Sequence, residues 1–266
     1  MSDGTRASRS GLSSRTRALF GAGYGPADDM HFVTMASKGN STAFGLDLGN
    51  RNGQGGLSNG TRGVMGGGGS PSLNNNVMSY VTISTAANAV DFGDLTTTDG
   101  RSGIGACAST TRGIFAGGGS SDVEYNIIDF ITISTTGNAT DFGDLNYTKT
   151  YGVGSGSNAT RAIWWGGTDT PGYSVVNNIS FKTIATTGNA TDFGDTSVTT
   201  HAGAACPDGT RCVMKLGSAS SGATGFTTNI EYVQFASTGN SIDFGDSVEN
   251  TLGVNLGAMS TGHGGL

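Results

Sequence analysis

The chain has 266 residues, enough to bury a core as one domain, and its net charge of −6 argues against the clustered basic surface that nucleic-acid binding requires. Glycine is abundant, with 47 residues against four prolines, and charged residues make up only 13% of the chain. The apolar 35% returns as short β-branched and aromatic runs, so glycine here separates strands rather than marking disorder.

The N-terminal residues carry no apolar stretch of the kind that a secretory signal or a membrane helix needs. We therefore expect a soluble protein made in the cytosol, without secretion or membrane insertion. The first residues form a positively charged arm that suits an acidic partner, although a solvated arm is the simpler interpretation; its arginines are Arg6, Arg9, Arg15 and Arg17. The three cysteines are too few for a disulfide framework, and all are expected to be reduced: Cys107, Cys206 and Cys212.

An internal repeat dominates the rest of the sequence. Thr-Arg precedes an apolar pair and a glycine doublet in steps of 45, 50, 49 and 50 residues, at Arg17, Arg62, Arg112, Arg161 and Arg211. Asp-Phe-Gly-Asp keeps the same period, beginning at Asp91, Asp141, Asp192 and Asp243, with a degenerate copy around Phe44. These landmarks predict a single domain over 1–266, with repeats at approximately 6–50, 51–100, 101–149, 150–199 and 200–250, and a closing strand and tail over 251–266.

Each repeat predicts four short antiparallel strands. In the third repeat these cover 101–108, 111–118, 127–135 and 139–144. Along the third strand Phe130 lies on one side and Ile131 and Ile133 on the other, so both faces of the sheet are expected to be buried. Sheets packed face to face around an axis satisfy this requirement, and the prediction is an all-β fold, a β-propeller of about five four-stranded blades.

The order of these motifs resembles a degenerate kelch repeat. Segments 61–69 and 133–145 are, more specifically, similar to repeats in virion structural and tail-fibre proteins of marine tailed phages, especially cyanophages, and this resemblance spans nearly the whole chain. It implies a component of a phage particle or an appendage for host attachment. The closing tryptophan of kelch repeats is absent, and its place falls to a phenylalanine in each copy: Phe92, Phe142, Phe193 and Phe244.

Catalytic motifs are not convincing. Asp-Phe-Gly repeats at the blade period and lacks the other kinase motifs, and the glycine runs lack the Lys-Ser/Thr ending of a phosphate loop. His31, His201 and His263 fall in different places without metal-ligand spacing. We therefore expect no enzyme, no metal site and no cofactor. An oxidase or glycosidase remains a third hypothesis that would need ligands or carboxylates converging on the axis.

Two groups of residues are assigned roles. The recurring arginines and aspartates are predicted to be structural partners, because buried charges must be paired: Arg62, Arg112, Arg161, Arg211, Asp91, Asp141, Asp192 and Asp243. The loops between the second and third strands vary in length and are predicted to form a contact face beside the links between blades. The candidate contact residues are Asn74, Asn75, Asn76, Trp165, Asp169 and Tyr173, although packing between blades is favoured for Trp165.

The function predicted from these observations is a non-enzymatic virion component that presents a rigid surface for protein contacts. The alternative is a lectin-like propeller that holds a host surface glycan. Expected partners are other virion proteins or further copies of the chain. The first-strand motif occurs six times and Thr-Arg five times, so one strand is surplus. We expect residues 251–258 to pair within the propeller and residues 1–13 to reach a neighbouring particle protein.

Overall fold

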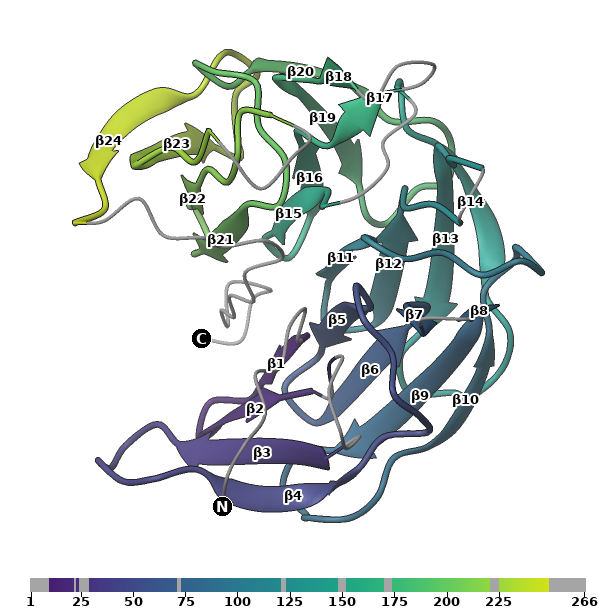
Figure 1. The fold of residues 1–266 in the computed structure, drawn as a ribbon. Helices are drawn as coiled ribbons and strands as arrows, with labels where there is room; N and C mark the ends of the chain where they lie inside the picture. Colours follow the sequence, from purple (N-terminus) through teal and green to yellow (C-terminus); the bar gives the residue numbers. More distant parts are fainter. Residues whose placement is uncertain are drawn as a thin grey trace.

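The computed structural model describes residues 10–21, 23, 29–70, 73–120, 123–147, 152–169, 174–220 and 225–248. Its strands form five four-stranded antiparallel sheets, in the arrangement of a five-bladed β-propeller. Figure 1 looks along the axis, with the first strand of each sheet towards the centre and the fourth at the rim. No helix occurs among the described residues, which confirms the all-β prediction.

Every blade is built from one repeat, in chain order. Blade 1 contains β1 (Gly11–Ser13), β2 (Arg17–Phe20), β3 (Asp29–Thr34) and β4 (Thr42–Leu46); blade 2 contains β5 (Gly55–Ser58), β6 (Arg62–Gly66), β9 (Val77–Thr82) and β10 (Val90–Asp94). Blade 3 contains β11 (Gly105–Ala108), β12 (Arg112–Ala116), β13 (Ile127–Thr132) and β14 (Thr140–Asp144). Blade 4 contains β15 (Gly154–Ser157), β16 (Arg161–Trp165), β19 (Asn178–Thr183) and β20 (Thr191–Asp195), and blade 5 contains β21 (Ala204–Pro207), β22 (Arg211–Lys215), β23 (Asn229–Gln234) and β24 (Ile242–Asp246).

The turn between the first two strands of a blade is set by one short polar side chain. Asn59 Oδ1 accepts hydrogen bonds from the backbone N–H groups of Thr61 and Arg62, at 3.1 and 2.9 Å. Asn158 and Asp208 make the same pair of bonds in blades 4 and 5. Such a side chain replaces a backbone turn, which is why Ser, Asn or Asp stands three residues before each recurring arginine.

The Asp-Phe-Gly-Asp motif forms a β-bulge in the fourth strand. In blade 3 the pairing shifts between Ile128 and Asp129, and Phe142 is the extra residue. The bulge turns Phe142 against Phe130, with ring centroids 5.8 Å apart and the rings nearly edge to face. Gly143 follows at φ +140°, a conformation that favours glycine. The motif is therefore explained by backbone geometry.

The hydrophobic core lies between the blades, in four clusters. Between blades 3 and 4, for example, Ile114, Ile128 and Phe142 of blade 3 pack against Trp164 and Ile184 of blade 4. Equivalent clusters join blades 1 and 2, 2 and 3, and 4 and 5. Each sheet between two neighbours is consequently buried on both faces, as the third-strand pattern predicts.

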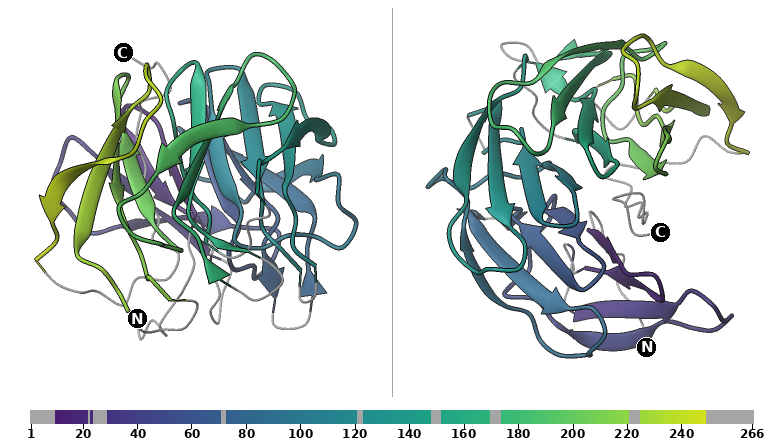
Figure 2. Two further views of the ribbon diagram at one scale, coloured as in Figure 1. Left: turned by 90° about the horizontal axis from the view of Figure 1, so that it is seen from above. Right: turned by 180° about the vertical axis from the view of Figure 1, so that it is seen from behind.

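The first and last blades do not adjoin in this structure. Figure 1 and the right view of Figure 2 show the five blades as an arc, with an interval between blade 1 and blade 5. Gly11–Ser13 forms β1, the innermost strand of blade 1, and pairs with β2. The expectation that residues 1–13 reach outward is therefore wrong for 11–13, because this strand completes the first blade. Residues 1–9 and the expected closing strand at 251–258 lie outside the described residues.

Candidate functional site

The recurring arginines connect each blade to the next one. Arg112 Nη1 donates a hydrogen bond of 2.9 Å to the carbonyl oxygen of Ile184 in blade 4. Its guanidinium lies 4.6 Å from the centroid of the Phe130 ring in its own blade, a cation–π arrangement. Arg17, Arg62 and Arg161 repeat both contacts in blades 1, 2 and 4. Arg211 lies over Tyr232 at 4.9 Å, and no blade follows it in the chain's described part.

The aspartates of Asp-Phe-Gly-Asp are not the partners of these arginines, which corrects the predicted pairing. Asp91, Asp141, Asp192 and Asp243 are exposed at the rim. Asp141 Oδ1 instead accepts a hydrogen bond of 3.1 Å from the N–H of Gly143, and Asp192 accepts one of 2.9 Å from the Asn178 amide. The carboxylate stabilises the local backbone, and the guanidinium charge is satisfied by a carbonyl oxygen and an aromatic ring.

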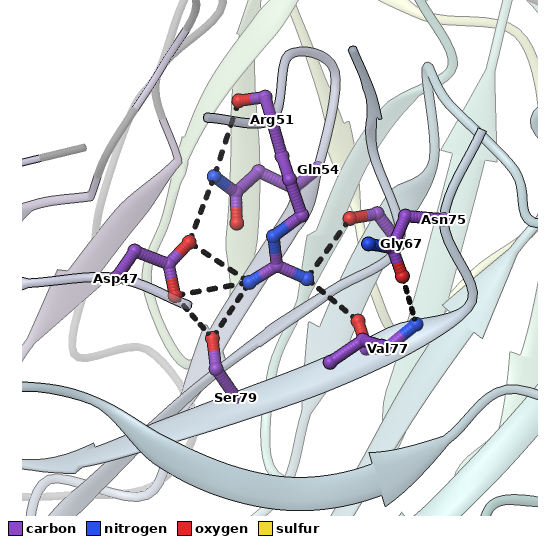
Figure 3. A network of polar contacts seen from close by, with 7 residues as sticks. All are labelled: Asp47, Arg51, Gln54, Gly67, Asn75, Val77 and Ser79. Atoms are coloured by element: carbon purple, nitrogen blue, oxygen red, sulfur yellow. Dashed lines mark hydrogen bonds and ion pairs between the residues drawn. The ribbon is translucent and has the colours of Figure 1, made fainter. Parts of the chain in front are cut away.

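Two other arginines, to which the sequence assigns no role, are buried at the starts of repeats 2 and 3. Figure 3 shows Arg51, whose Nη2 contacts both carboxylate oxygens of Asp47, at 3.0 and 2.8 Å, and Ser79 Oγ at 2.7 Å. Its Nη1 donates to the carbonyl oxygens of Gly67 and Val77. Asp47 belongs to the link from blade 1, so this network fixes one blade to the next.

Arg101 repeats this arrangement in blade 3, where its acidic partner is Asp129. Arg101 Nη1 donates to the carbonyl oxygens of Gly117 and Ile127, at 2.9 and 2.8 Å, and Nη2 contacts Asp129. Burial lowers the pKa of Arg101, and the Asp129 carboxylate opposes that shift. The sequence does contain a signal for this site: Arg51 and Arg101 are 50 residues apart, which is the period of the repeat.

The loops after the glycine doublets emerge beside the links between blades, as predicted. In blade 2 the link residue Asn52 and the loop residue Gly69 exchange two backbone hydrogen bonds, at 2.7 and 2.8 Å. Ser102 with Gly119 and His201 with Ser218 repeat this bridge in blades 3 and 5. Loops and links therefore share one face of the propeller, which we call the loop face.

The loops themselves differ from blade to blade. In blades 2 and 4 they form small hairpins, β7 (Gly69–Ser70) with β8 (Leu73–Asn74) and β17 (Thr168–Asp169) with β18 (Ser174–Val175). In blades 3 and 5 the described parts form only isolated bridges. The bridge between link and loop is thus repeated, whereas the secondary structure of the loop beyond it differs between blades.

Most of the predicted contact residues lie at the base of this face. Asn75 Oδ1 accepts a hydrogen bond of 2.7 Å from the Val77 N–H, and the Asn76 carbonyl accepts one of 2.8 Å from Leu95. Asn74 pairs with Gly69 in the hairpin, and Asp169 pairs with Ser174. These contacts hold the loops in place. Tyr173 lies outside the described residues.

Trp165 is not a surface residue, which corrects its place among the contact residues. Its side chain is fully buried between blades 4 and 5, in a cluster with Ile163 and Met214. Glycines make the room, since a Cβ on Gly154 would lie 2.2 Å from Trp165 Cε2 and one on Gly203 would lie 3.0 Å from Nε1. Packing between blades, the interpretation that the sequence favours for this residue, is what the structure shows.

A small cavity of about 80 Å³ lies on the axis, lined by the inner strands of all five blades. Its lining consists of glycine, serine and alanine residues with Leu57, Cys107 and Pro207. Ser157 Oγ accepts from the Ala108 N–H and donates to its carbonyl, so the hydroxyl links two inner strands. Burial raises the pKa of the Cys107 thiol to about 12, which keeps it protonated and unreactive at neutral pH.

The described residues contain no group of three or more His, Cys, Asp or Glu side chains that could hold a metal ion. His31 contacts Asp29 at 2.8 Å, and His201 is buried, with Nδ1 3.2 Å from the Ser218 carbonyl oxygen. His263 lies outside the described residues. A helix that could span a membrane is likewise absent from the part of the chain that the structure describes.

Comparison with models of known protein families finds none that matches the chain, and a search of the curated proteins finds no match either.

Proposed function

We propose that the chain is a non-enzymatic structural or appendage component of a tailed-phage virion, in which a rigid propeller presents the loop face to other proteins. The proposal draws on the likeness of the repeat to kelch repeats and on its resemblance to repeats in phage tail-fibre and virion proteins. The observation that carries it is the contrast between constant and variable parts of the repeat.

The constant parts serve the contacts between blades. The recurring arginines, the Phe-Gly bulges and the buried Arg51 and Arg101 networks all contribute to blade boundaries. The loops above the Asn52–Gly69 type of bridge vary in length and secondary structure. Function in repeat scaffolds generally belongs to such variable loops on a rigid base.

The axial cavity gives no reason to propose catalysis at the centre of the propeller. It is small, and no carboxylate, imidazole or ammonium group is among its described lining residues. A general acid or base would need such a group at the reacting atoms.

Purified particles of the phage that encodes the chain provide the test. Mass spectrometry should detect the chain in the particle at a fixed ratio to the major capsid protein, and immunogold labelling should place it on the capsid, tail or fibre. A chain that is abundant in infected cells but absent from washed particles would contradict the proposal. A portal, sheath or fibre gene next to the coding sequence would support it.

The lectin alternative depends on the polar residues of the loop face, such as Asn76 and Asp169. It predicts saturable binding on a glycan array, with several equivalent sites per chain. The Asn75 amide oxygen already accepts a backbone hydrogen bond, so a glycan would have to bind above this base. An array without binding, together with a stable complex with a particle protein, favours the structural role.

A further inference from the structure

The four boundaries between blades are copies of one interface, and each has two different sides. The forward side of a blade presents its fourth strand: the Phe92 carbonyl of blade 2 accepts from Gly137 N–H at 2.7 Å, and the Asp94 carbonyl accepts from Ala139 at 2.8 Å. The rear side of the next blade presents the Gly-Asn turn, whose Asn138 Oδ1 accepts from Asp94 N–H at 3.0 Å. Blades 3 and 4, and 4 and 5, repeat all three bonds.

Among the described residues, no blade lies against the forward side of blade 5. Phe244 is 56% exposed, whereas the four equivalent phenylalanines of blades 1 to 4 are 2 to 3% exposed. Val213 and Ile230, which correspond to the buried Ile114 and Ile128 of blade 3, are only half-buried. Arg211 keeps its aromatic ring but has no carbonyl oxygen of a following blade to bind. One half of the repeated interface is therefore uncovered by the part of the chain that the structure describes.

The rear side of blade 1 is the other unused half. Met35 is 47% exposed, whereas its equivalents Ile83, Ile133, Ile184 and Phe235 are 0 to 2% exposed. Each of these four carbonyls accepts the arginine of the preceding blade, and Met35 has no preceding blade. The turn Gly39-Asn40-Ser41, which corresponds to Gly137-Asn138-Ala139, is exposed. Ala18, Phe20 and Val33 complete a half-buried apolar surface beside it.

The two unused sides are complementary, because the same kinds of residue already bind each other at four boundaries within the chain, with all three strand-to-turn bonds at three of them and two of the three between blades 1 and 2. From this we infer that the forward side of blade 5 binds the rear side of blade 1 of a second copy of this chain. In that contact Phe244 packs against Met35 and Phe20, and Arg211 donates to the Met35 carbonyl. The Gly39-Asn40-Ser41 turn pairs with the edge of β24.

A single contact between two different surfaces leaves one forward side and one rear side of the pair free, and a shift along the axis keeps these two sides from meeting each other. The arc of Figure 1 already turns most of the way around its axis, so a second copy has room only if the contact between copies adds a shift along that axis to the rotation that relates neighbouring blades. The expected product is an open head-to-tail assembly. This inference concerns contacts between copies and does not depend on the virion role proposed above.

The test is the mass of the full-length chain in solution, by light scattering after size exclusion and by sedimentation velocity over a range of concentrations. The expected result for the wild type is a mass that rises with concentration in multiples of the monomer. A monomer at every concentration up to the solubility limit would overturn the inference, because the two ends would then be covered by the chain's own segments or by each other.

Two variants make the test specific. Phe244→Asp removes the forward side of blade 5, and Met35→Asp removes the rear side of blade 1; both residues are exposed, so folding should persist, which circular dichroism checks. Val90→Asp is the matched control, since Val90 is 52% exposed on the rim strand β10, away from both ends. Each end variant alone should be monomeric, and the control should assemble like the wild type.

A mixture of the two variants is the decisive arm. The Met35→Asp chain keeps an intact forward side, and the Phe244→Asp chain keeps an intact rear side. An equimolar mixture should therefore form a heterodimer and nothing larger. Assembly of either variant by itself at the wild-type concentration, or a mixture that stays monomeric, would overturn the head-to-tail contact.

Discussion

Arg62 of blade 2 donates a hydrogen bond of 3.0 Å to the carbonyl oxygen of Ile133 in blade 3, while its guanidinium lies 4.3 Å from the ring centroid of Tyr80 in its own blade. One side chain thus serves two sheets. The aromatic ring orients the guanidinium, and the carbonyl satisfies one of its donors at a partly buried position. The same arrangement recurs at Arg17, Arg112 and Arg161, so the recurring arginine links each blade to the next by a hydrogen bond.

Arg112→Ala should lower the free energy of unfolding by about 2 to 3 kcal/mol, because it removes a hydrogen bond from a charged donor and a cation–π contact. Arg211→Ala is the matched control: it loses the contact with Tyr232 but no bond to a following blade, and about 1 kcal/mol is expected. Urea unfolding of both variants, at a concentration where the chain is monomeric, measures the difference. Equal losses would show that the carbonyl bond contributes nothing.

Gly143→Ala should destabilise the chain through two effects. The residue has φ +140°, and an added Cβ would lie 2.5 Å from the carbonyl carbon of Gly188 in the next blade. Gly245→Ala has nearly the same φ, +136°, and its Cβ would meet nothing within 4 Å. We expect about 1 to 2 kcal/mol for Gly245→Ala from backbone strain and a clearly larger loss for Gly143→Ala. Thermal unfolding compares them, and similar losses would rule out a clash across the blade boundary.

The loss of folding stability at low pH should depend partly on the ionisation of Asp208. The N–H groups of Arg211 and Thr210 hold the pKa of this exposed carboxylate below its ordinary value of 3.8. A lowered folded-state pKa gives stability that is present above pH 3.8 and is lost as the pH falls below it. Asp208→Asn keeps the turn, since Asn59 and Asn158 occupy the same position in blades 2 and 4. The variant should be slightly less stable than the wild type at pH 7, because it lacks the charged acceptor, and the two stabilities should converge as the pH falls below 3.8. Parallel pH profiles would contradict this.

The three cysteines should differ in reactivity. Cys206 is exposed, whereas Cys107 and Cys212 are buried with raised pKa values because burial disfavours their thiolates. Treatment with a thiol reagent at pH 8 should modify Cys206 rapidly and leave the other two unmodified until denaturant is added. Peptide mass spectrometry identifies the modified positions. Rapid native modification of Cys107 would mean that the inner strands open far more often than this core implies.

The fold could be predicted because its signals are local and repeated. The period of the Thr-Arg and Asp-Phe-Gly-Asp motifs gives the number of blades, and the apolar faces around Phe130 give burial on both sides. The partner of Arg112 could not be predicted, since Ile184 contributes only its carbonyl oxygen and any residue has one. The sequence favours packing between blades for Trp165 but cannot identify the space it fills, because that space is made by Gly154 on β15 and by Gly203 just before β21.

The candidate site was predictable only in part. The shared position of loops and links follows from strand order, and the Asn52–Gly69 bridge confirms it. Asn75 is predicted to contact a partner, but its side chain accepts a hydrogen bond from the Val77 N–H, two residues along the chain. Asn side chains commonly make this bond in turns. The sequence offers two segments, within 1–13 and 251–258, for one inner-strand position. The strand pattern alone does not show which of them occupies it. The pairing of Gly11–Ser13 with β2 places the N-terminal strand in blade 1, and Leu12 is buried in the cluster between blades 1 and 2.

The direction of the arginine bonds has a consequence for synthesis on the ribosome. Every such bond runs from a blade to the blade that is translated after it, as from Arg17 to Ile83 and from Arg161 to Phe235. A newly made blade can therefore form its own four strands but must wait for about 50 more residues before its forward side is covered. During elongation, the forward side of the most recently completed blade is the one apolar side at the growing end that is not yet covered. Translation in this order limits the apolar surface that is exposed at the growing end to the forward side of a single blade.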